Sequence, residues 1–306
     1  MAKILIATEK PFAKVAVDGI KEVAAEAGVD VVLLEKYTDK SELLTAVADV
    51  DAMIIRSDKI DNEVFDSAKK LKIVVRAGAG YDNVDLAAAT NHGVVVMNTP
   101  GQNANAVAEL VFGLLVFAVR NFYNGKAGTE LKGKKLGILA YGNVGRCVAT
   151  IAKGFGMEIY AYDAFCPAEV IAADGVKPVL SQDELFEKCE IVSLHIPATS
   201  ETRQSINYEL LNKMPKGGVL VNTARKEVIN EAELLQLMCE RTDLKFVTDI
   251  MPDADTEFKA YDGRYFSTPK KMGAQTAEAN INAGLAAARQ IVAYLKDGCT
   301  KYQVNK

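Results

Sequence analysis

The stretch LGILAYGNVGRCVATIAKGFGMEIYAYD, residues 136–163, decides the fold of this chain. An apolar run ends at Ala140, a loop contains Gly142 and Gly145, a helical pattern follows, and a second apolar run ends at Asp163. This order of strand, glycine loop, helix and strand is a βαβ unit, and an acid 21 positions after Gly142 has dinucleotide-loop spacing. The stretch therefore predicts a parallel sheet that binds a dinucleotide at the carboxyl ends of its strands.

The glycines and the acid of this loop have separate roles in such a site. Gly142 lets the backbone approach a pyrophosphate, Gly145 lets the helix pack closely on the strand, and amides at the helix start bind phosphates. Asp163 can accept hydrogen bonds from the adenosine ribose and would repel a 2′-phosphate, which favours NAD over NADP. Ala140 departs from the pattern, because most such loops have their first glycine at this position.

Strands and helices alternate through the rest of the chain in the same way. Short β-branched runs without polar alternation are typical of strands that are covered on both faces. We therefore predict an α/β fold with right-handed crossovers and two doubly wound parallel sheets. The expected strands are Lys3–Ala7, Val31–Leu34, Ala52–Ile55, Ile73–Arg76, Val94–Met97, Leu136–Ala140, Glu158–Asp163, Ile191–Leu194, Val219–Asn222 and Phe246–Asp249.

The series of strands runs twice, once before Pro100 and again from Leu136. A helical stretch from Asn103 to about Arg120 separates the two series, and a final one, Ala277–Leu295, is expected to return to the first domain. We predict a flavodoxin-like domain over residues 1–98 and 283–306, and a Rossmann-like NAD domain over residues 99–282. The ligand cleft is expected where the two domains meet.

The composition argues against several classes of partner. The chain has 306 residues, 49% apolar and 25% charged, which is the balance of a soluble globular protein. Its formal net charge of −4 argues against a nucleic-acid or membrane-surface partner, and the apolar run at residues 104–119 is too short for a membrane span. The five cysteines have no CxxC spacing, so we expect a reducing, cytoplasmic location and no bound metal.

Three further motifs carry a family resemblance: RAGAGYDNVDLAAATNHGVVVMNTPGQNANAVAEL at Arg76–Leu110, LHIPAT at Leu194–Thr199, and VNTARKEVINEAEL at Val221–Leu234. With these motifs in this order, the chain resembles the D-2-hydroxyacid dehydrogenase family over nearly its whole length, and most of all its D-3-phosphoglycerate dehydrogenase branch. The resemblance implies a substrate-binding domain beside the NAD domain, NAD as cofactor, a homodimer, and a small 2-hydroxy acid as substrate. We expect no regulatory domain after the last helix.

The resemblance assigns the reaction centre and the cofactor contacts. Arg225 matches the arginine that binds the substrate carboxylate and polarises the reacting C2 oxygen, which suits a permanently charged, forked guanidinium. Asp249 matches the aspartate that holds the nicotinamide carboxamide. The cofactor-binding positions implied in this way are Gly142, Asn143, Val144, Gly145, Asp163, His195, Ile196, Pro197, Thr199, Thr223, Ala224, Asp249 and Gly273.

The resemblance also assigns the substrate contacts. The glycines of the RAGAG motif let main-chain amides face a carboxylate and form an anion-binding concavity. Arg56 matches a basic position that binds the phosphate in phosphoglycerate dehydrogenases, although a solvated loop arginine would look the same in the sequence. The substrate-binding positions implied in this way are Arg56, Ser57, Arg76, Ala77, Gly78, Ala79, Gly80 and Asn98.

The acid–base machinery departs from the family pattern. The family has a histidine after a Thr-Pro dipeptide and a glutamate five residues after the nicotinamide aspartate. Here lysines follow Thr268–Pro269, and the glutamate position holds Ala254, flanked by Asp253 and Asp255. Counting forward from Thr268–Pro269 favours Lys270 as the base, and counting back from Gly273 favours Lys271. We lean to Lys270 because it directly follows the proline.

The two departures are chemically consistent with each other. A carboxylate beside an imidazole raises a pKa that starts near 6.5 and orients the ring. The same carboxylate beside an ammonium, whose pKa starts near 10.4, would hold the proton too tightly for a base at neutral pH. A lysine base instead needs burial and positive neighbours to lower its pKa, and Arg225 and the second lysine can supply the positive charge.

The leading functional hypothesis is NAD-dependent oxidation of 3-phosphoglycerate to 3-phosphohydroxypyruvate, the entry step of serine biosynthesis. Arg225 would polarise the substrate, and Lys270 or Lys271 would act as general base. One alternative is a hydroxypyruvate or glyoxylate reductase. Another is an NAD-sensing binding protein that has kept the fold and lost the chemistry.

Overall fold

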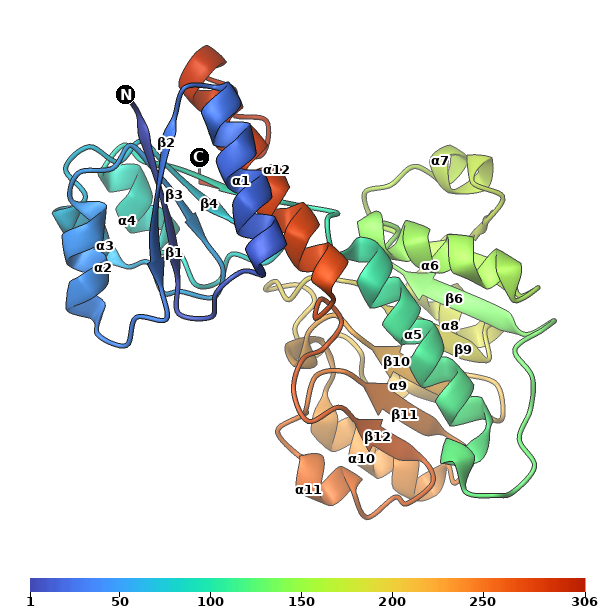
Figure 1. Ribbon diagram of the computed structural model, residues 1–306. Coiled ribbons are helices and arrows are strands. Elements are labelled where there is room, and N and C mark those ends of the chain that lie inside the picture. The colour runs from blue at the N-terminus through green and yellow to red at the C-terminus, as the bar shows by residue number, and fades with distance from the viewer. Residues whose placement is uncertain (306) are drawn as a thin grey trace. The chain divides into compact units, whose positions relative to one another are not determined.

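The computed structural model describes residues 1–305 and divides into two compact units (Figure 1). Unit 1 consists of Met1–Asn103 together with the chain from Thr276 onward, and unit 2 is Ala104–Gln275. The sequence boundaries were expected at residues 98/99 and 282/283. Each unit has its own parallel sheet, so the predicted α/β class with two parallel sheets is confirmed.

Unit 1 is a five-stranded parallel sheet in the order β2-β1-β3-β4-β5. Alternate residues of β1 enter different cores: Ile4 and Ile6 pack under α1 and α12, whereas Leu5 and Ala7 pack under α2, α3 and α4. Both faces of the sheet are therefore covered, as the apolar strands require. The elements are β1 (Lys3–Thr8), α1 (Lys14–Glu26), β2 (Asp30–Glu35), α2 (Lys40–Val47), β3 (Ala52–Ile55), α3 (Asn62–Ser67), β4 (Ile73–Arg76), α4 (Leu86–Asn91), β5 (Val95–Asn98) and α12 (Ala277–Asp297).

Unit 2 is a seven-stranded parallel sheet in the order β12-β11-β10-β9-β6-β7-β8. One core packs under α5, α6 and α7, and a second core on the other face packs under α8, α9, α10 and α11. The elements are α5 (Ala104–Val119), β6 (Lys135–Leu139), α6 (Asn143–Gly154), β7 (Glu158–Tyr162), α7 (Ala168–Ala173), β8 (Lys177–Pro178), α8 (Gln182–Lys188), β9 (Ile191–Leu194), α9 (Tyr208–Asn212), β10 (Val219–Asn222), α10 (Glu231–Glu240), β11 (Lys245–Thr248), α11 (Asp255–Phe258) and β12 (Tyr265–Ser267). Short 3-10 turns occupy Asn121–Tyr123 and Lys226–Val228.

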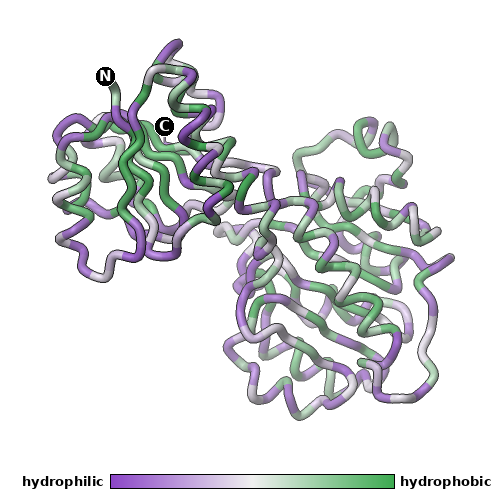
Figure 2. The backbone as a smooth tube through the Cα atoms, viewed as in Figure 1, coloured by the Kyte–Doolittle hydropathy of each residue, from purple (hydrophilic) through white to green (hydrophobic). Residues whose placement is uncertain are grey.

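The hydropathy of the chain follows this layering. Figure 2 shows hydrophobic residues concentrated in the strands of both sheets and hydrophilic residues in most connecting loops. The most apolar helix, α5, has 16 residues. No helix among residues 1–305 is both long enough and apolar enough to span a lipid bilayer.

Candidate functional site

The glycine loop of unit 2 connects β6 to α6 and has the geometry of a phosphate cradle. A Cβ atom at Gly145 would lie 2.4 Å from the carbonyl oxygen of Ala140, so only glycine allows this close approach of helix and strand. A Cβ atom at Gly142 would meet no atom within 4 Å. Gly142 precedes α6 without capping it through a side chain, which leaves the first-turn amides available to an anion.

Asp163 lies directly after β7 and is fixed by backbone amides. Its Oδ2 accepts from the amide of Tyr141 at 2.6 Å, and its Oδ1 accepts from the amides of Phe165 and Cys166, both at 2.8 Å. A carboxylate has about four acceptor positions, so capacity remains for a ribose hydroxyl. The Tyr141 contact ties the acid to the glycine loop itself.

The predicted nicotinamide residues include two buried polar atoms that need a partner. Asp249 Oδ2 accepts from the amides of Gly273 at 2.6 Å and Met272 at 3.3 Å, whereas Asp249 Oδ1 and Thr223 Oγ1 are buried without a hydrogen bond. Burial raises the pKa of Asp249, and the Gly273 amide and the Lys271 charge oppose that rise. Because buried polar atoms are normally satisfied, these two fit a bound carboxamide.

The residues of the predicted adenosine side follow β9. Ile196 is buried and Pro197 is exposed. Thr199 uses its hydroxyl within its own turn, donating to Glu201 at 2.7 Å. His195 Nε2 lies 3.0 Å from Ser193 Oγ, and burial of the ring lowers the pKa of His195 to about 3. The imidazole is therefore neutral at physiological pH.

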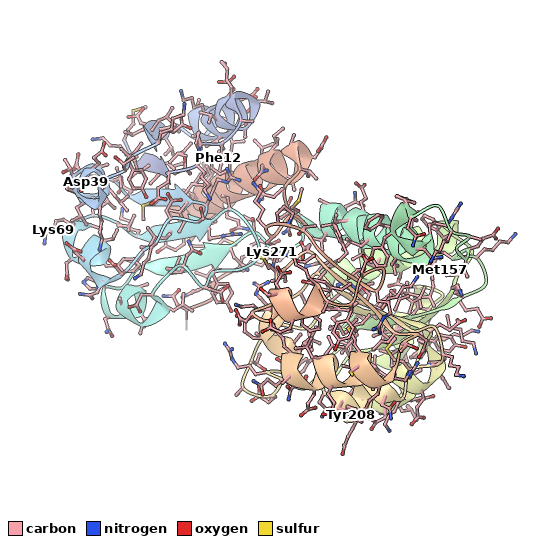
Figure 3. The ribbon with its side chains drawn as sticks, turned by 90° about the horizontal axis from the view of Figure 1, so that it is seen from below. Phe12, Asp39, Lys69, Met157, Tyr208 and Lys271 are labelled. Atoms are coloured by element: carbon pink, nitrogen blue, oxygen red, sulfur yellow. The ribbon has the colours of Figure 1, made fainter. Side chains whose placement is uncertain are left out.

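Arg225 and Lys271 meet at one backbone oxygen in unit 2. Asn222, at the end of β10, donates to the Arg225 carbonyl at 2.9 Å and accepts from the Ala224 amide at 3.0 Å, so the loop has a defined shape. Arg225 Nη1 donates to the Ala224 carbonyl at 2.9 Å, and Lys271 Nζ, labelled in Figure 3, donates to the same oxygen at 3.0 Å.

The structure therefore brings Lys271, and not Lys270, beside Arg225. Both lysines are exposed residues, and they differ in their contacts. The backbone carbonyl of Lys270 accepts from Thr268 Oγ1 at 2.7 Å, whereas Lys271 donates through Nζ to the Ala224 carbonyl. The sequence-based preference for Lys270 rested only on its position directly after Pro269. In the turn, Thr268 is buried and its hydroxyl contacts the carbonyls of Asp249 and Lys270.

Neither acid beside Ala254 replaces the glutamate of the family pattern in this geometry. Asp253 pairs with Lys226 at 2.5 Å, and its side chain is 81% exposed. Asp255 pairs with Lys259 at 2.5 Å and accepts from the hydroxyl of Tyr265 at 2.7 Å. Both carboxylates are thus engaged by residues other than Lys271.

The RAGAG loop of unit 1 presents free amides. Gly78 has φ +145°, a backbone conformation that residues with a Cβ atom rarely adopt, so this position favours glycine. Asn98 Nδ2 donates to the Ala79 carbonyl at 2.6 Å, which orients the loop. The amides of Gly78, Ala79 and Gly80 donate to no acceptor among residues 1–305, so they fit the predicted anion-binding concavity.

Arg56 is held from several sides within unit 1. Nη1 donates to the carbonyls of Lys10 at 3.0 Å and Pro11 at 3.1 Å, Nη2 donates to Asn280 Oδ1 at 2.6 Å, and the guanidinium lies 5.2 Å from the Phe12 ring centroid. Burial lowers the pKa of Arg56, although it stays charged. A guanidinium has five N–H donors, so two remain for a ligand after these three bonds. The neighbouring Ser57 is exposed.

Sequence reasoning missed the acid that shapes this loop. Asp58 is 1% exposed and accepts from the Glu9 amide at 2.7 Å, the Tyr37 hydroxyl at 2.9 Å and the Arg56 amide at 3.1 Å. It sits three residues after β3, in the segment already quoted for Arg56. An acid so close to a buried strand was the available signal.

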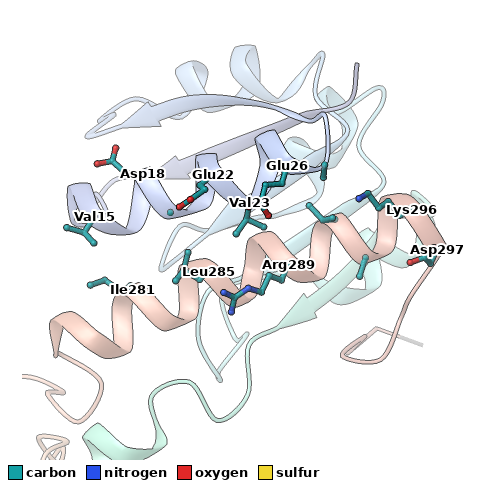
Figure 4. Close-up of a pocket in the computed structure, with 14 residues that line it drawn as sticks. Val15, Asp18, Glu22, Val23, Glu26, Ile281, Leu285, Arg289, Lys296 and Asp297 are labelled. Carbon is teal, nitrogen blue, oxygen red and sulfur yellow. The ribbon is translucent and has the colours of Figure 1, made fainter.

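A pocket on unit 1 is separate from all of these residues. It lies between α1 and α12 (Figure 4), with Val15, Val23, Leu285 and Arg289 among its lining. It contains none of the predicted site residues, because it opens between the two helices and not at the carboxyl ends of the strands. Among residues 1–305, no group of three or more His, Cys, Asp or Glu side chains could hold a metal ion.

Comparison with known proteins adds to this geometry. The family model for the D-isomer specific 2-hydroxyacid dehydrogenase NAD binding domain matches residues 117–264. D-3-phosphoglycerate dehydrogenase of Methanocaldococcus jannaschii is 36% identical, over 87% of this chain and 54% of the relative. Hydroxypyruvate reductase of Thermotoga maritima is 34% identical, over 84% of this chain and 88% of the relative. The chain spans about half the length of several curated relatives that it matches.

Among solved structures, an NAD⁺-bound 3-phosphoglycerate dehydrogenase of Entamoeba histolytica has a TM-score of 0.90 and is 48% identical, covering 100% of this chain and 99% of that one. D-lactate dehydrogenase of Escherichia coli, at 23% identity and a TM-score of 0.78, shares the fold.

Proposed function

The chain belongs to the D-isomer specific 2-hydroxyacid dehydrogenase family and carries its NAD-binding domain, and from this membership we propose that it oxidises 3-phosphoglycerate to 3-phosphohydroxypyruvate. Oxidation of the hydroxyl at C2 needs three things from the protein: a grip on the carboxylate, a base for the hydroxyl proton, and a position for the hydride acceptor. Bound NAD⁺ supplies that acceptor.

The observation that carries the proposal is the convergence of Arg225 and Lys271 on the Ala224 carbonyl. Arg225 would pair with the carboxylate and polarise the C2 oxygen. The Lys271 amine would take the hydroxyl proton. The positive charge of Arg225 favours the neutral form of the Lys271 amine, whereas the negative charge of Asp249, which also faces Lys271, favours the ammonium.

The NAD-binding residues have an equally specific arrangement. The amides at the start of α6 would hold the pyrophosphate, Asp163 the adenosine ribose, and Asp249 Oδ1 with Thr223 Oγ1 the carboxamide. In unit 1, the free amides of residues 78–80 would bind the substrate carboxylate and Arg56 the phosphate.

The base assignment is tested with two neighbouring alanine variants. Lys271→Ala should lower kcat by roughly 10²–10⁴-fold, the usual contribution of a positioned general base, while NADH binding is retained. Lys270→Ala is the matched control and should keep kcat within about twofold, because Lys271 and not Lys270 donates to the Ala224 carbonyl beside Arg225. NADH formation at saturating substrate is the measurement.

Added primary amines should restore part of the Lys271→Ala turnover, which a purely structural lysine would not show. Full turnover in Lys271→Ala would rule out this base. A large loss in Lys270→Ala with none in Lys271→Ala would reassign the role to Lys270.

The substrate is tested by comparing 3-phosphoglycerate with glycerate. Arg56→Ala should raise KM for the phosphorylated acid by about tenfold or more and change glycerate turnover little, since a charge-assisted hydrogen bond contributes about 1.5–3 kcal/mol. Glycerate turnover also reports whether the loop around Arg56 has kept its shape. Equal losses on both substrates would show that Arg56 is only structural.

Reduction of hydroxypyruvate is the second candidate, and the Thermotoga maritima relative favours it because that match covers most of both chains. Faster turnover of unphosphorylated hydroxypyruvate than of phosphohydroxypyruvate would select it. Absence of NADH formation with any 2-hydroxy acid, with NADH binding intact, would instead indicate an NAD-sensing binding protein.

We further propose that the enzyme acts as a homodimer in the cytoplasm, at the entry to serine biosynthesis. All five cysteines are free thiols, which fits a reducing compartment. Light scattering of the purified protein measures the oligomeric state directly.

A further inference from the structure

The coenzyme loop contains a backbone conformation that its own sequence disfavours. Ala140 has φ +78°, in the left-handed region, where every residue with a Cβ atom is strained and glycine is not. This is the position where most dinucleotide loops have their first glycine. Contacts outside Ala140 must therefore hold the loop in this shape.

The next residue, Tyr141, is anchored through both its backbone and its ring. Its amide donates to Asp163 Oδ2 at 2.6 Å. The residue is 2% exposed, and its hydroxyl donates to Asp174 Oδ2 at 3.2 Å. Burial and the Asp174 charge raise the pKa of Tyr141 to about 12, so the phenol keeps the proton that it donates.

The same carboxylate oxygen is also bound from the far side of the glycine loop. Arg146, in the first turns of α6, donates from Nη1 to Asp174 Oδ2 at 2.6 Å, and its guanidinium lies 4.9 Å from the Tyr141 ring centroid. Nη2 contacts Cys166 Sγ at 3.5 Å. Asp174 itself is held at the end of α7, where Lys153 donates to its carbonyl. One oxygen thus joins the residues on either side of Gly142–Gly145.

We propose that Tyr141, Arg146 and Asp174 form a loop clamp that holds the coenzyme loop ready for NAD. They are positioning residues: the clamp keeps Ala140 in its strained conformation and, through the Tyr141 amide, places the Asp163 carboxylate. Without the clamp, the loop would relax and would have to be reordered when NAD binds, which weakens binding. The inference rests on the NAD-binding domain and not on the proposed substrate.

The first test removes the charge of the clamp and keeps its shape. Asp174→Asn should raise the Kd for NADH by roughly tenfold, which corresponds to about 1.4 kcal/mol, while kcat at saturating NAD⁺ stays within about twofold. Glu169→Gln, an exposed acid on the same helix, is the matched control and should leave Kd unchanged. NADH fluorescence gives Kd, so the result does not depend on which hydroxy acid is the substrate.

The second test asks whether the clamp acts through Ala140. Ala140→Gly alone should change Kd little, and in the Asp174→Asn background it should recover most of the lost affinity, because glycine adopts the left-handed conformation without strain. In the absence of any ligand, amide hydrogen exchange at residues 140–146 should be faster in Asp174→Asn than in the wild type.

Unchanged NADH affinity in Asp174→Asn, or an affinity loss that Ala140→Gly does not relieve, would overturn the proposal. Tyr141→Phe, which removes only the hydroxyl, provides an independent variant should Asp174→Asn fold poorly. It should weaken NADH binding in the same direction and by a smaller factor.

Discussion

At the scale of single residues, His195, on the predicted adenosine side of unit 2, makes the stability of the fold depend on pH. The residue partly reaches solvent, but its imidazole is enclosed by protein and lies beside Ser193 Oγ. Burial lowers the pKa of His195 to about 3, so the folded protein keeps this ring neutral where an unfolded chain would protonate it. The other histidine, His92, has its pKa raised by the Ala88 carbonyl and by Asp66.

The sign of the resulting pH dependence follows from proton uptake. Below about pH 6.5 the unfolded chain binds a proton at residue 195 that the folded chain does not, so stability present above that pH is lost as the pH falls toward 3. Between about pH 7 and 5.5, the low pKa of His195 should lower the free energy of unfolding by about 1 kcal/mol. His195→Gln should remove that part of the loss, as measured by urea unfolding at both pH values.

His92→Gln is the control for this experiment. Because the pKa of His92 is raised, its protonation favours the folded state at low pH, and removing it should not reduce the acid loss. An acid loss in His195→Gln as large as in the wild type would show that other groups set it.

At the scale of elements, the turn from β6 to α6 contains two glycines that are needed for different reasons. Gly145 serves the packing of helix on strand, because a Cβ there would strike the Ala140 carbonyl. Gly142 has room for a Cβ in the protein alone, and its φ of −80° suits any residue. Gly142 is therefore needed for the approach of the ligand, and Gly145 is needed for the packing of the fold.

This difference gives opposite results for two alanine substitutions. Gly145→Ala should destabilise the protein by about 1–3 kcal/mol, the usual cost of forcing an extra methyl into a packed contact. Gly142→Ala should unfold like the wild type and bind NADH at least about tenfold more weakly, because its methyl group occupies the approach to the pyrophosphate. Urea unfolding and NADH fluorescence separate the two effects. Wild-type NADH affinity in Gly142→Ala would contradict this reading of the loop.

A helix cap and two short strands show which details of the elements the sequence pattern does not predict. Ser181 caps α8 by accepting from the Glu184 amide at 3.1 Å, and the Glu184 carboxylate accepts from the amide of Leu180, one residue before the cap, at 2.8 Å. The strands β8 and β12 were not predicted. They have two and three residues, and β8 includes Pro178, so neither carries a run long enough to signal a strand.

At the scale of the whole molecule, unit 1 closes its core with a segment distant in sequence, whereas unit 2 is one continuous stretch of chain. In unit 1, α12 packs against α1, although the two helices lie near opposite ends of the sequence. The end of the chain then reaches β5, where Asn305 accepts from the Val96 amide at 2.7 Å and donates to the Val94 carbonyl at 2.9 Å. Asn305 is 5% exposed, so these bonds satisfy the otherwise open edge of the sheet.

The sequence alone determined the α/β class, the parallel strands and the dinucleotide loop, because these depend on local signals. Apolar runs, glycines at fixed spacing and an acid after a strand are each readable within about 30 residues. The family motifs extended that reading to Arg225 and the RAGAG loop. The departures at Ala140, Ala254 and the lysine pair were also visible in the sequence.

Tertiary structure alone decided which side chains meet. Lys270 and Lys271 are adjacent and chemically identical, so only the path of the turn after β12 could place one of them on the Ala224 carbonyl. The strand orders, the buried Asp58 and the shared oxygen of Asp174 likewise join residues with no local relationship. Such contacts form because a packed core permits one arrangement of its surface loops, and no sequence window contains that information.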